Sequence, residues 1–286
     1  MAARVNSLPP DLLSNFQIIH SRVRDLDHSK KKILVLHDLA GDPEVQHLRN
    51  GGWKKFDKLV FVSHWQKQQY QDYLGVPPSA GTVLKNAIEP ANPHGKPTDK
   101  IRLMYYSTPH RGLDILFAVF KPLAQEFPNI ELNVFSSFDL YGWEQRDEPY
   151  KQLFQELNEH PQVNYSKSVS NERIRKELQR SHILAYPSKW SETSCLVLIE
   201  AMCHGLTCVH SSLAALPETG LNLTHMYDFH EDDNEHARLF YVALRNAILT
   251  YQNSNQQRQT QAAISNAVYS WEYRKTQWEN LLQSLL

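Results

Sequence analysis

Short apolar runs and segments of helical length alternate through most of this chain, and this alternation limits its fold more than any other feature. The apolar runs, each typical of a buried strand, are 101–107, 130–135, 162–166, 182–186, 207–211 and 224–229. The segments with a helical pattern between them include 112–127, 149–160, 171–180 and 195–205. Strands joined by helices in this order cross over in the right-handed sense and build a parallel sheet covered on both faces. The sequence therefore predicts an α/β fold.

The first third of the chain shows the same order of elements. Buried strands are predicted there because apolar and β-branched residues run together instead of alternating with polar ones, at 15–23, 31–39, 57–63 and 82–88. A helix is predicted at 64–75, with Ser63 as its N-cap and Gly75 as its end. The sequence contains no GxGxxG motif, which excludes a dinucleotide fingerprint. A length of 286 residues with 41% hydrophobic content suits two domains with real cores.

The stretch YPSKWSETSCLVLIEAMCHG, 186–205, holds two acidic residues where a strand passes through a loop into a helix. Glu192 lies in the loop, and Glu200 lies inside the helix. Ligands of parallel sheets bind where strand carboxyl ends meet helix amino ends, and a carboxylate that accepts two hydroxyl donors recognises a vicinal diol. The alternative from the residues alone is a helix-start charge at Glu192 and a solvated Glu200. The backbone N–H groups that could hold a phosphate beside them are those of Thr193, Ser194 and Cys195.

The motif PS-x2-SE-x7-EAM-x2-G, followed by TCVHSS and ALPET, resembles the carboxyl-terminal domain of retaining glycosyltransferases with the GT-B fold. This is the large nucleotide-sugar family numbered four, also described as glycosyl transferases group 1. The resemblance extends from about Lys31 to the end of the chain and is strongest over 101–218. It implies that Glu192 contacts hydroxyls of the donor sugar and that Glu200 contacts the ribose of the nucleotide. The family's usual small residues are replaced at 193–195, which implies a sugar pocket of a different shape.

The resemblance also implies the domain organisation. In the GT-B fold two Rossmann-like domains have parallel sheets that face each other across a cleft. We predict a shortened amino-terminal, acceptor-side domain at 1–92 and a nucleotide-sugar-binding domain at 93–270. A final helix at 271–286 is expected to pack back onto the amino-terminal domain through an aromatic face that includes Tyr273 and Trp278. Periodicity alone leaves open an ordinary amphipathic helix of the second domain.

The turn YSTPHRG places a cation where a phosphate would bind. Arg111 can offer two parallel donors to a diphosphate beside the N–H groups of the following helix, although a surface arginine is the simpler alternative. The family usually has a second cation early in this turn, where Ser107 stands here, so Lys189 or Lys167 is a candidate for the missing charge. The residues predicted to bind the donor sugar and the diphosphate are Ser107, Thr108, Arg111, Lys189, Glu192, Thr193, Ser194 and Cys195.

His37 directly follows the apolar run ILVL, at the carboxyl end of a predicted strand. A lone histidine there is often a hydrogen-bonded structural residue, whereas the resemblance implies a position near the transferred sugar and the acceptor. The resemblance also implies that the loop with Ser168 and Val169 meets the nucleotide base through backbone groups. The predicted catalytic residues are Glu192, Arg111 and His37, and the predicted nucleotide-binding residues are Ser168, Val169 and Glu200.

Charge and composition limit the kinds of molecule that the chain is expected to bind. The net charge is −1, so no overall field attracts nucleic acid. Lysine clusters at 30–32 and 54–58 are solvated surface in the simplest interpretation, with peripheral membrane contact as the alternative. The sequence has no apolar run of membrane-spanning length and no signal-peptide pattern, so a cytoplasmic location is expected. Asp25 and Asp27 form only a weak DxD pattern, and we expect no metal ion and no cofactor other than the nucleotide-sugar co-substrate.

We therefore predict a glycosyltransferase of the EC 2.4 class that transfers a sugar from a nucleotide diphosphate sugar. It is expected to work without a metal ion and to retain the anomeric configuration. Its acceptor would be a glycan, a lipid-linked molecule or a protein. The alternative is a nucleotide-sugar-binding subunit that needs a partner chain for the acceptor side, because the amino-terminal third is short. The partners considered include such a partner subunit and a homo-oligomer.

Overall fold

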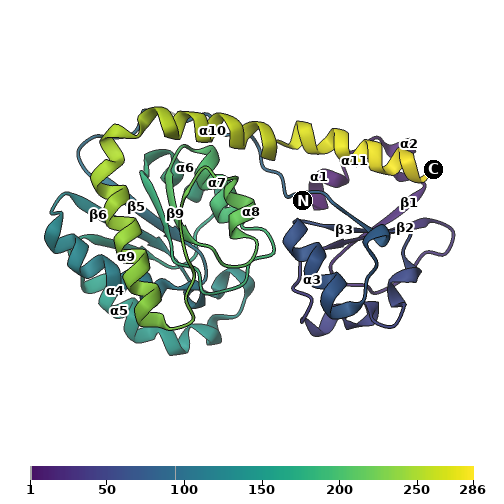
Figure 1. Cartoon of the computed structure of the whole chain (residues 1–286), viewed down its shortest axis with the longest axis horizontal. Coiled ribbons are helices and arrows are strands. Elements are labelled where there is room, and N and C mark those ends of the chain that lie inside the picture. The colour runs from purple at the N-terminus through teal and green to yellow at the C-terminus, as the bar shows by residue number, and fades with distance from the viewer. Residues whose placement is uncertain (1, 94) are drawn as a thin grey trace. The chain divides into compact units, whose positions relative to one another are not determined.

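The computed structural model describes residues 2–93 and 95–286 and divides the chain into two compact units (Figure 1). The first unit comprises Met1–Pro90, Ser191–Leu196 and Asn266–Leu286, and the second comprises Ala91–Trp190 and Val197–Ser265. The first unit thus contains both ends of the chain and part of the motif loop. The motif segment is the main difference from the predicted boundaries, which are set at 92 and 270.

A six-stranded parallel sheet forms the centre of the second unit, in the order β10-β9-β8-β5-β6-β7. Its strands are β5 (Ile101–Tyr106), β6 (Ile130–Phe135), β7 (Val163–Ser166), β8 (Ile183–Tyr186), β9 (Thr207–Ser211) and β10 (His225–Tyr227). Every residue of β5 and of β8 is buried, as expected for strands covered on both faces. The prediction of a parallel α/β fold is confirmed for this unit.

Helices cover both faces of this sheet (Figure 1). On one face lie α4 (Leu113–Glu126), α5 (Lys151–Glu159) and α9 (Asp233–Thr250). On the other lie α6 (Asn171–Arg180), α7 (Leu196–Cys203) and α8 (Leu216–Gly220). The side chain of Asp232 caps α9 by accepting hydrogen bonds from the next turn, so the acidic residues there stabilise the start of a helix.

A four-stranded parallel sheet, in the order β1-β2-β3-β4, forms the centre of the first unit. Its strands are β1 (Phe16–His20), β2 (Lys31–Leu36), β3 (Lys58–Phe61) and β4 (Gly81–Val83). The helix α3 (His64–Leu74) begins where the Ser63 hydroxyl accepts the Gln66 N–H at 3.0 Å, and it ends at Gly75 with φ 68°. The predicted strands, helix and caps are therefore confirmed, although the last strand is shorter than the predicted 82–88.

Successive residues of β2 point into two separate cores, because side chains alternate across a strand. Leu34 packs in a cluster with Tyr70 of α3. Ile33 packs on the opposite face in a cluster with Trp278 of α11 (Trp271–Leu285). That second face is completed by two short helices, α1 (Ala2–Val5) and α2 (Pro10–Leu13), which both contact α11. Burial of each large apolar side chain stabilises the fold by about 1.5–3 kcal/mol.

The carboxyl-terminal segment forms two helices. The first, α10 (Asn255–Tyr269), ends at Ser270, whose hydroxyl accepts the Tyr273 N–H at 3.2 Å and so caps α11. The Ile88 N–H donates to the Tyr269 carbonyl at 2.9 Å and ties this break to the segment after β4. Trp278 is buried as predicted, but Tyr273 is 51% exposed, so its place on the packing face was wrongly predicted. Five positions separate the two residues, which puts their side chains roughly 140° apart around the helix.

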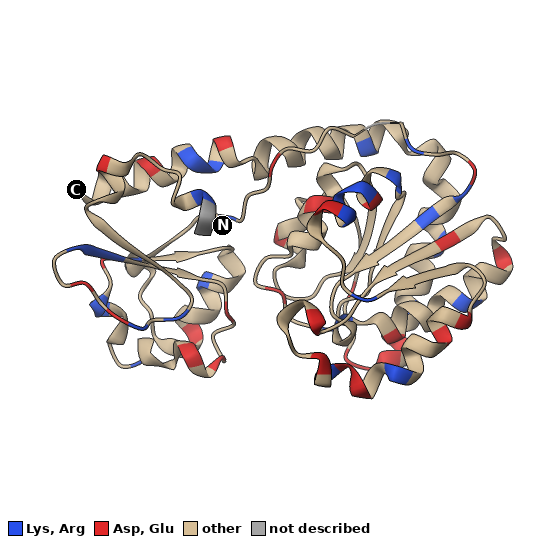
Figure 2. Ribbon diagram, turned by 180° about the vertical axis from the view of Figure 1, so that it is seen from behind, with Lys and Arg blue, Asp and Glu red and all other residues tan. Residues whose placement is uncertain are grey.

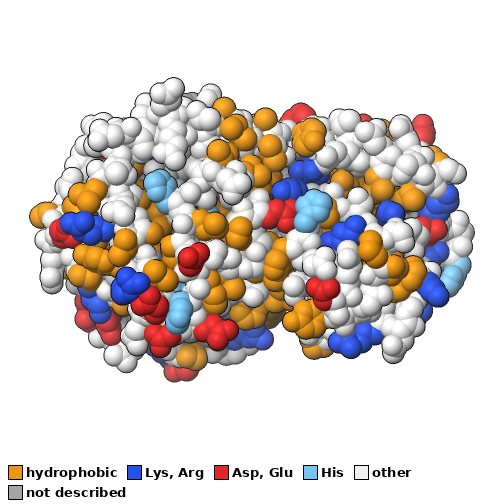
Figure 3. All heavy atoms as spheres, viewed as in Figure 1, with side chains coloured by type: hydrophobic (Ala, Val, Ile, Leu, Met, Phe, Trp, Pro, Cys, Tyr) orange, Lys and Arg blue, Asp and Glu red, His pale blue; other side chains and the backbone are white. Residues whose placement is uncertain are grey.

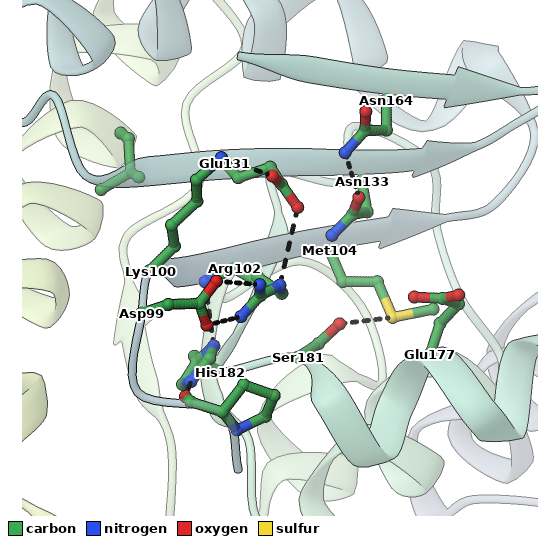
Figure 4. A network of polar contacts seen from close by, with 12 residues as sticks. Asp99, Lys100, Arg102, Met104, Glu131, Asn133, Asn164, Glu177, Ser181 and His182 are labelled. Carbon is green, nitrogen blue, oxygen red and sulfur yellow. Dashed lines mark hydrogen bonds and ion pairs between the residues drawn. The ribbon is translucent and has the colours of Figure 1, made fainter.

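A polar network holds the start of the six-stranded sheet to the segment before it (Figure 4). Arg102 of β5 donates to both carboxylate oxygens of Asp99, at 2.9 and 2.7 Å. His182, just before β8, accepts the Arg102 N–H through Nδ1 at 2.9 Å and bonds the Pro97 carbonyl through Nε2 at 2.8 Å. Burial lowers the pKa of His182 to about 4, so the ring is neutral and Nε2–H is the donor. The network lies at the amino ends of the strands, away from the edge where such sheets bind ligands.

Basic and acidic residues are both distributed along the ribbon, as expected for a net charge of −1 (Figure 2). The face drawn in Figure 3 mixes hydrophobic, basic and acidic side chains in small groups. Among the helices of residues 2–93 and 95–286, none has the length and apolar character needed to cross a bilayer.

Candidate functional site

The six-stranded sheet has one point where its connections change direction. The chain leaves β5 toward β6 and β7, and it leaves β8 the other way toward β9 and β10, although β5 and β8 are paired neighbours. Open α/β sheets bind ligands beside the carboxyl ends of the strands at such a point. Ser107, Thr108 and Arg111 follow β5, and Lys189 follows β8, so the structure places these predicted site residues there.

The turn after β5 brings Arg111 onto Ser107. The Arg111 Nη1 group donates to the Ser107 hydroxyl at 3.2 Å, and the Thr108 carbonyl accepts from the buried Tyr105 hydroxyl at 2.8 Å. Thr108 is itself buried. The serine that stands in place of a second cation therefore positions the guanidinium, close to the amino end of α4, where the helix dipole also favours an anion.

Gly112 separates Arg111 from α4 and allows the turn to form. Its φ is 96°, and a Cβ atom added there would lie 2.0 Å from the Pro187 carbonyl oxygen, at the end of β8. Glycine is therefore required twice over, by backbone conformation and by the close approach of the two loops.

Gly112→Ala is expected to lower the free energy of unfolding by about 3 kcal/mol, from backbone strain of about 1–2 kcal/mol plus overpacking of about 1–3 kcal/mol. Urea denaturation followed by tryptophan fluorescence measures the loss. Gly75→Ala is the matched control, because Gly75 also has a positive φ, 68°, but has open space around it. Equal losses in the two variants would show that the contact with Pro187 has no energetic role.

Lys189 is held by two carboxylates. Its ammonium group lies 2.7 Å from Asp114 and 3.1 Å from Asp233. Burial alone would lower the pKa of Lys189, but the hydrogen bonds to Asp114 and Asp233 outweigh burial and raise it. The positive charge is thus already balanced, and a phosphate would have to compete with both carboxylates for it.

Glu200 lies in α7 beside the end of β5. The Tyr106 hydroxyl donates to the Val197 carbonyl at 2.7 Å and lies 3.5 Å from a Glu200 carboxylate oxygen. Burial raises the pKa of Glu200, while Arg175 and Tyr106 act in the opposite direction. Tyr106 immediately precedes Ser107, so the structure brings the predicted ribose ligand and the predicted phosphate turn to the same strand end.

The loop after β7 meets the loop after β6. The Ser168 hydroxyl donates a short hydrogen bond to Asp139, and both Ser168 and Val169 are half-buried. Burial would raise the pKa of Asp139, but hydrogen bonds from Ser168 and Ser137 lower it below its ordinary value, so its carboxylate is ionised at neutral pH. Asp139 was not predicted, and it adds a fixed acceptor beside the predicted base-binding loop.

Another unpredicted residue, His110, lies within the phosphate turn. Its ring stacks on Phe138 at 5.2 Å and meets Trp190 edge-on at 4.9 Å. Burial, with Arg111 and Arg146 nearby, lowers the pKa of His110 to about 4. The ring is therefore neutral and acts as an aromatic wall beside Arg111.

The remaining predicted residues belong to the first unit. His37 directly follows β2, and its carbonyl accepts the Thr193 hydroxyl at 2.8 Å. Glu192, which directly precedes Thr193 in the sequence, is 8% exposed. The structure thus places the motif segment 191–196 at the carboxyl end of the four-stranded sheet beside His37. Burial lowers the pKa of His37 to about 4.

His20, at the end of β1, lies next to His37 and was also not predicted. The two rings stack with centroids 6.1 Å apart and an interplanar angle of 14°. Burial, and then the neighbouring His37, lowers the pKa of His20 to about 4. Both imidazoles are therefore uncharged at neutral pH.

The weak DxD pattern forms a turn. Asp27 accepts hydrogen bonds from the Ser29 N–H and hydroxyl, and the Asp25 carbonyl accepts from Gln17. Over residues 2–93 and 95–286, no group of three or more His, Cys, Asp or Glu side chains is arranged to hold a metal ion. Metal independence itself stays a prediction.

Comparison with known proteins identifies a family domain in the chain. Residues 89–223 match the family model described as glycosyl transferases group 1. The chain contains a glycosyl transferases group 1 domain. The matched residues include every predicted site residue except His37, and they contain the segment 101–218 where we found the strongest resemblance. No curated protein matches the chain in sequence.

Solved structures share the fold of this glycosyltransferase. Sucrose-phosphate synthase from Thermosynechococcus elongatus matches with a TM-score of 0.71 and 15% identity, over 90% of this chain and 68% of that one. A glycosyltransferase from Rickettsia africae matches with a TM-score of 0.73 and 14% identity, over 96% and 79%. Anabaena HepE, solved in complex with UDP-glucose, matches with a TM-score of 0.69 and 17% identity, over 89% and 72%. The fold is of the GT-B type, as predicted.

The residues that were missed share one property. Asp139 and His110 follow a strand closely, and His20 is the last residue of one, so all three lie at the carboxyl end of a strand. That position was the only indication in the sequence that these residues belong to the site. Their contact partners Ser168, Trp190 and His37 come from other segments of the chain, so the contacts could not be predicted from neighbouring residues.

Proposed function

We propose that this glycosyltransferase moves a sugar from a nucleoside diphosphate sugar to an acceptor hydroxyl, with retention of anomeric configuration and without a metal ion or a cofactor. The observation that carries the proposal is the cluster of Arg111, Ser107 and Glu200 around the end of β5. It offers a guanidinium for a diphosphate and a carboxylate for a ribose within one strand end. The structure of HepE, a complex with UDP-glucose, supports the choice of a nucleotide-sugar donor.

The difficult step is departure of the diphosphate while the sugar carbon becomes electron-poor. Arg111 would bind the leaving oxygens through two parallel N–H donors, and the amino end of α4 would add its dipole. Preorganised charge of this kind is usually the largest single contribution to such a step. Ser107 fixes the guanidinium in advance, so little reorganisation is required.

The acidic residues have positioning roles. Glu192 would accept hydrogen bonds from hydroxyls of the donor sugar, and Glu200 would accept them from the ribose. When the sugar is held in a reactive geometry, the entropy of orienting the reactants is lost on binding. That loss then no longer adds to the activation free energy of the transfer step. His37, beside the motif segment, would contact the sugar or the acceptor, and its neutral ring can do so as a hydrogen-bond partner.

Bond changes on one face of the sugar would account for retention. The bond from the anomeric carbon to the diphosphate breaks, and the diphosphate leaves with the electron pair. The acceptor oxygen bonds to the same carbon from the same side, and its proton passes to the departing phosphate oxygen. No side chain is required as a covalent nucleophile in this scheme.

A direct test combines binding with product analysis. Calorimetry with UDP-glucose, UDP-N-acetylglucosamine, GDP-mannose and ADP-glucose would identify the donor. Proton NMR of the product then gives the anomeric configuration, and the rate in EDTA tests metal independence. An inverted product, or loss of activity in EDTA that magnesium restores, would contradict the corresponding part of the proposal.

Glu200→Ala is expected to weaken binding of the nucleoside diphosphate about 10–100-fold, because hydrogen bonds to a charged group contribute about 1.5–3 kcal/mol. The free nucleoside diphosphate, titrated in a calorimeter, measures this without turnover. Glu172→Ala is the control, since Glu172 is exposed on α6 and paired with Lys176. Unchanged affinity in Glu200→Ala would remove the ribose assignment.

A second candidate function is a nucleotide-sugar-binding subunit that needs another chain. The GtfA/B complex matches with a TM-score of 0.67 and 14% identity, over 90% of this chain and 53% of that one, and was solved as a complex. Tight donor binding with no hydrolysis or transfer until a partner is added would favour this function. Turnover by the isolated chain would exclude it.

Neither the turn with Arg111 nor the segment with Glu192 and Glu200 identifies the class of acceptor. A glycan, a lipid-linked molecule or a protein each supplies the hydroxyl that the scheme requires. Peripheral contact with a membrane, through the lysines at 54–58, would fit the lipid-linked case, and binding to anionic vesicles would test it.

A further inference from the structure

His20 and His37 occupy the carboxyl ends of two adjacent parallel strands. β1 and β2 are paired in register, with His20 opposite Val35 and His37 just beyond the end of β2. The imidazole rings stack, and the His37 carbonyl accepts the hydroxyl of Thr193. The pair therefore lies at the ligand-binding edge of the first unit's sheet, beside the segment proposed to hold the donor sugar.

Neither ring nitrogen of His20 has a hydrogen-bond partner among the described residues, although both are buried. The Oδ2 atom of Asp38 is also buried and also has no hydrogen-bond partner among the described residues. A buried polar group without a partner costs about 1–3 kcal/mol, so a ligand that supplies a partner would recover this free energy. Unsatisfied groups gathered at a ligand-binding edge point to a site that a substrate completes.

The backbone at His20 is itself specialised. Ser21 has φ 58°, in the left-handed region, and the Arg22 N–H donates back to the His20 carbonyl at 2.7 Å. A non-glycine residue in this conformation costs of order 1–3 kcal/mol and is found mainly at functional positions. The tight turn fixes where the His20 side chain leaves the strand.

The charge around the pair disfavours an anion. Arg22 is surrounded by three carboxylates, at 4.0 Å from Asp38, 4.0 Å from Asp42 and 3.0 Å from Glu44. Both imidazoles are neutral at pH 7 because burial lowers their pKa values to about 4. A neutral imidazole has one donor and one acceptor, which complements a hydroxyl group, whereas phosphate needs an excess of donors or positive charge.

We propose that His20, stacked on the His37 already assigned to the sugar or the acceptor, completes the acceptor subsite of this glycosyltransferase, and that the subsite binds the hydroxyl group of a neutral, phosphate-free saccharide. This inference rests on the proposed function and narrows its acceptor. His20 hydrogen-bonds the acceptor hydroxyl and orients its oxygen toward the anomeric carbon, next to the sugar held by Glu192. The proton still leaves with the diphosphate, so His20 is a positioning residue and does not change its protonation.

The test separates attack by water from attack by a saccharide. Release of nucleoside diphosphate is measured with the donor alone and with added methyl α-glucoside, methyl α-galactoside, methyl α-mannoside, glucose and glucose 6-phosphate. In His20→Ala the donor-alone rate is expected to stay within about twofold of the original protein, whereas kcat/KM for the best glycoside falls about 10–100-fold. Glucose is expected to be a better acceptor than glucose 6-phosphate. The control is His28→Ala, since His28 lies in the turn between β1 and β2.

His20→Gln keeps a donor and an acceptor, and it is expected to recover part of the transfer rate with an unchanged donor-alone rate. Equal losses of hydrolysis and transfer would show instead that His20 only supports His37 or the fold. An unchanged kcat/KM, or a preference for glucose 6-phosphate, would also overturn the inference.

A binding measurement keeps the inference separate from the proposed function. Saturation-transfer NMR detects the same glycosides on the original protein and on His20→Ala without any turnover. Absence of donor binding and hydrolysis would refute the proposed function, while the NMR comparison would still decide the role of His20. If the original protein binds none of the glycosides, or if His20→Ala binds them equally well, the subsite does not exist.

Discussion

Replacing Glu192 by glutamine is expected to reduce transfer about 10³-fold while nucleoside diphosphate affinity stays within about twofold. The amide keeps the shape of the side chain but loses the charge that strengthens hydrogen bonds from two sugar hydroxyls, each worth about 1.5–3 kcal/mol. The groups proposed to bind the nucleotide, Arg111 and Glu200, belong to a different unit and are unchanged. Initial rates give the first quantity, and calorimetric titration with the free nucleoside diphosphate gives the second.

Glu192 is nearly buried, so its replacement has to be distinguished from a structural defect. Glu272→Gln in the first turn of α11 is the control, because Glu272 is an exposed glutamate of the same unit. Thermal unfolding of both variants checks the fold. A Glu192→Gln protein that transfers sugar at the original rate would remove Glu192 from the site, and one that loses nucleotide affinity equally would move it to the nucleotide.

Much of the fold could be predicted because local signals and the final packing agree. The run IRLMYY is apolar or aromatic at nearly every position, and all of β5 is buried. Ser63 and Gly75 were identified as helix caps from residue type alone, and the structure confirms both. The turn containing Arg111 followed from the same logic, since a parallel strand that runs into a helix must present its loop at the ligand-binding edge.

Other features depend on contacts between distant segments, which periodicity does not record. The break at Ser270 is fixed by backbone hydrogen bonds to Ile88, far away in the sequence. The pairing of Ser168 with Asp139 depends on two loops whose strands are neighbours in the sheet. The stack of His20 on His37 depends in the same way on the pairing of β1 with β2. Strand order was needed before the last two contacts could be predicted.

Replacing Arg111 by alanine is expected to slow transfer by about 10²–10³-fold, the loss that follows when one preorganised donor to a developing negative charge is removed. The affinity for the nucleoside diphosphate should also fall, by about tenfold, because the product carries the charge that leaves the sugar. The variant loses the guanidinium but keeps Ser107, Gly112 and the start of α4, so the helix amino end remains. Rates and calorimetric affinities measured at low and high salt test both parts.

Three other replacements separate the effect of the Arg111 guanidinium from the effect of losing a positive charge. Arg111→Lys keeps the charge but loses the planar pair of donors, so an intermediate rate is expected. Arg180→Ala, at the exposed end of α6, is the control for loss of a surface arginine. Lys189→Ala tests whether the lysine that pairs with Asp114 and Asp233 also contacts the phosphate. If this variant binds the nucleoside diphosphate more weakly, and the difference becomes smaller at high salt, Lys189 is the second cation. If Arg111→Ala transferred sugar as fast as the original protein, the diphosphate would have to be bound elsewhere, and the cluster at the end of β5 would be structural.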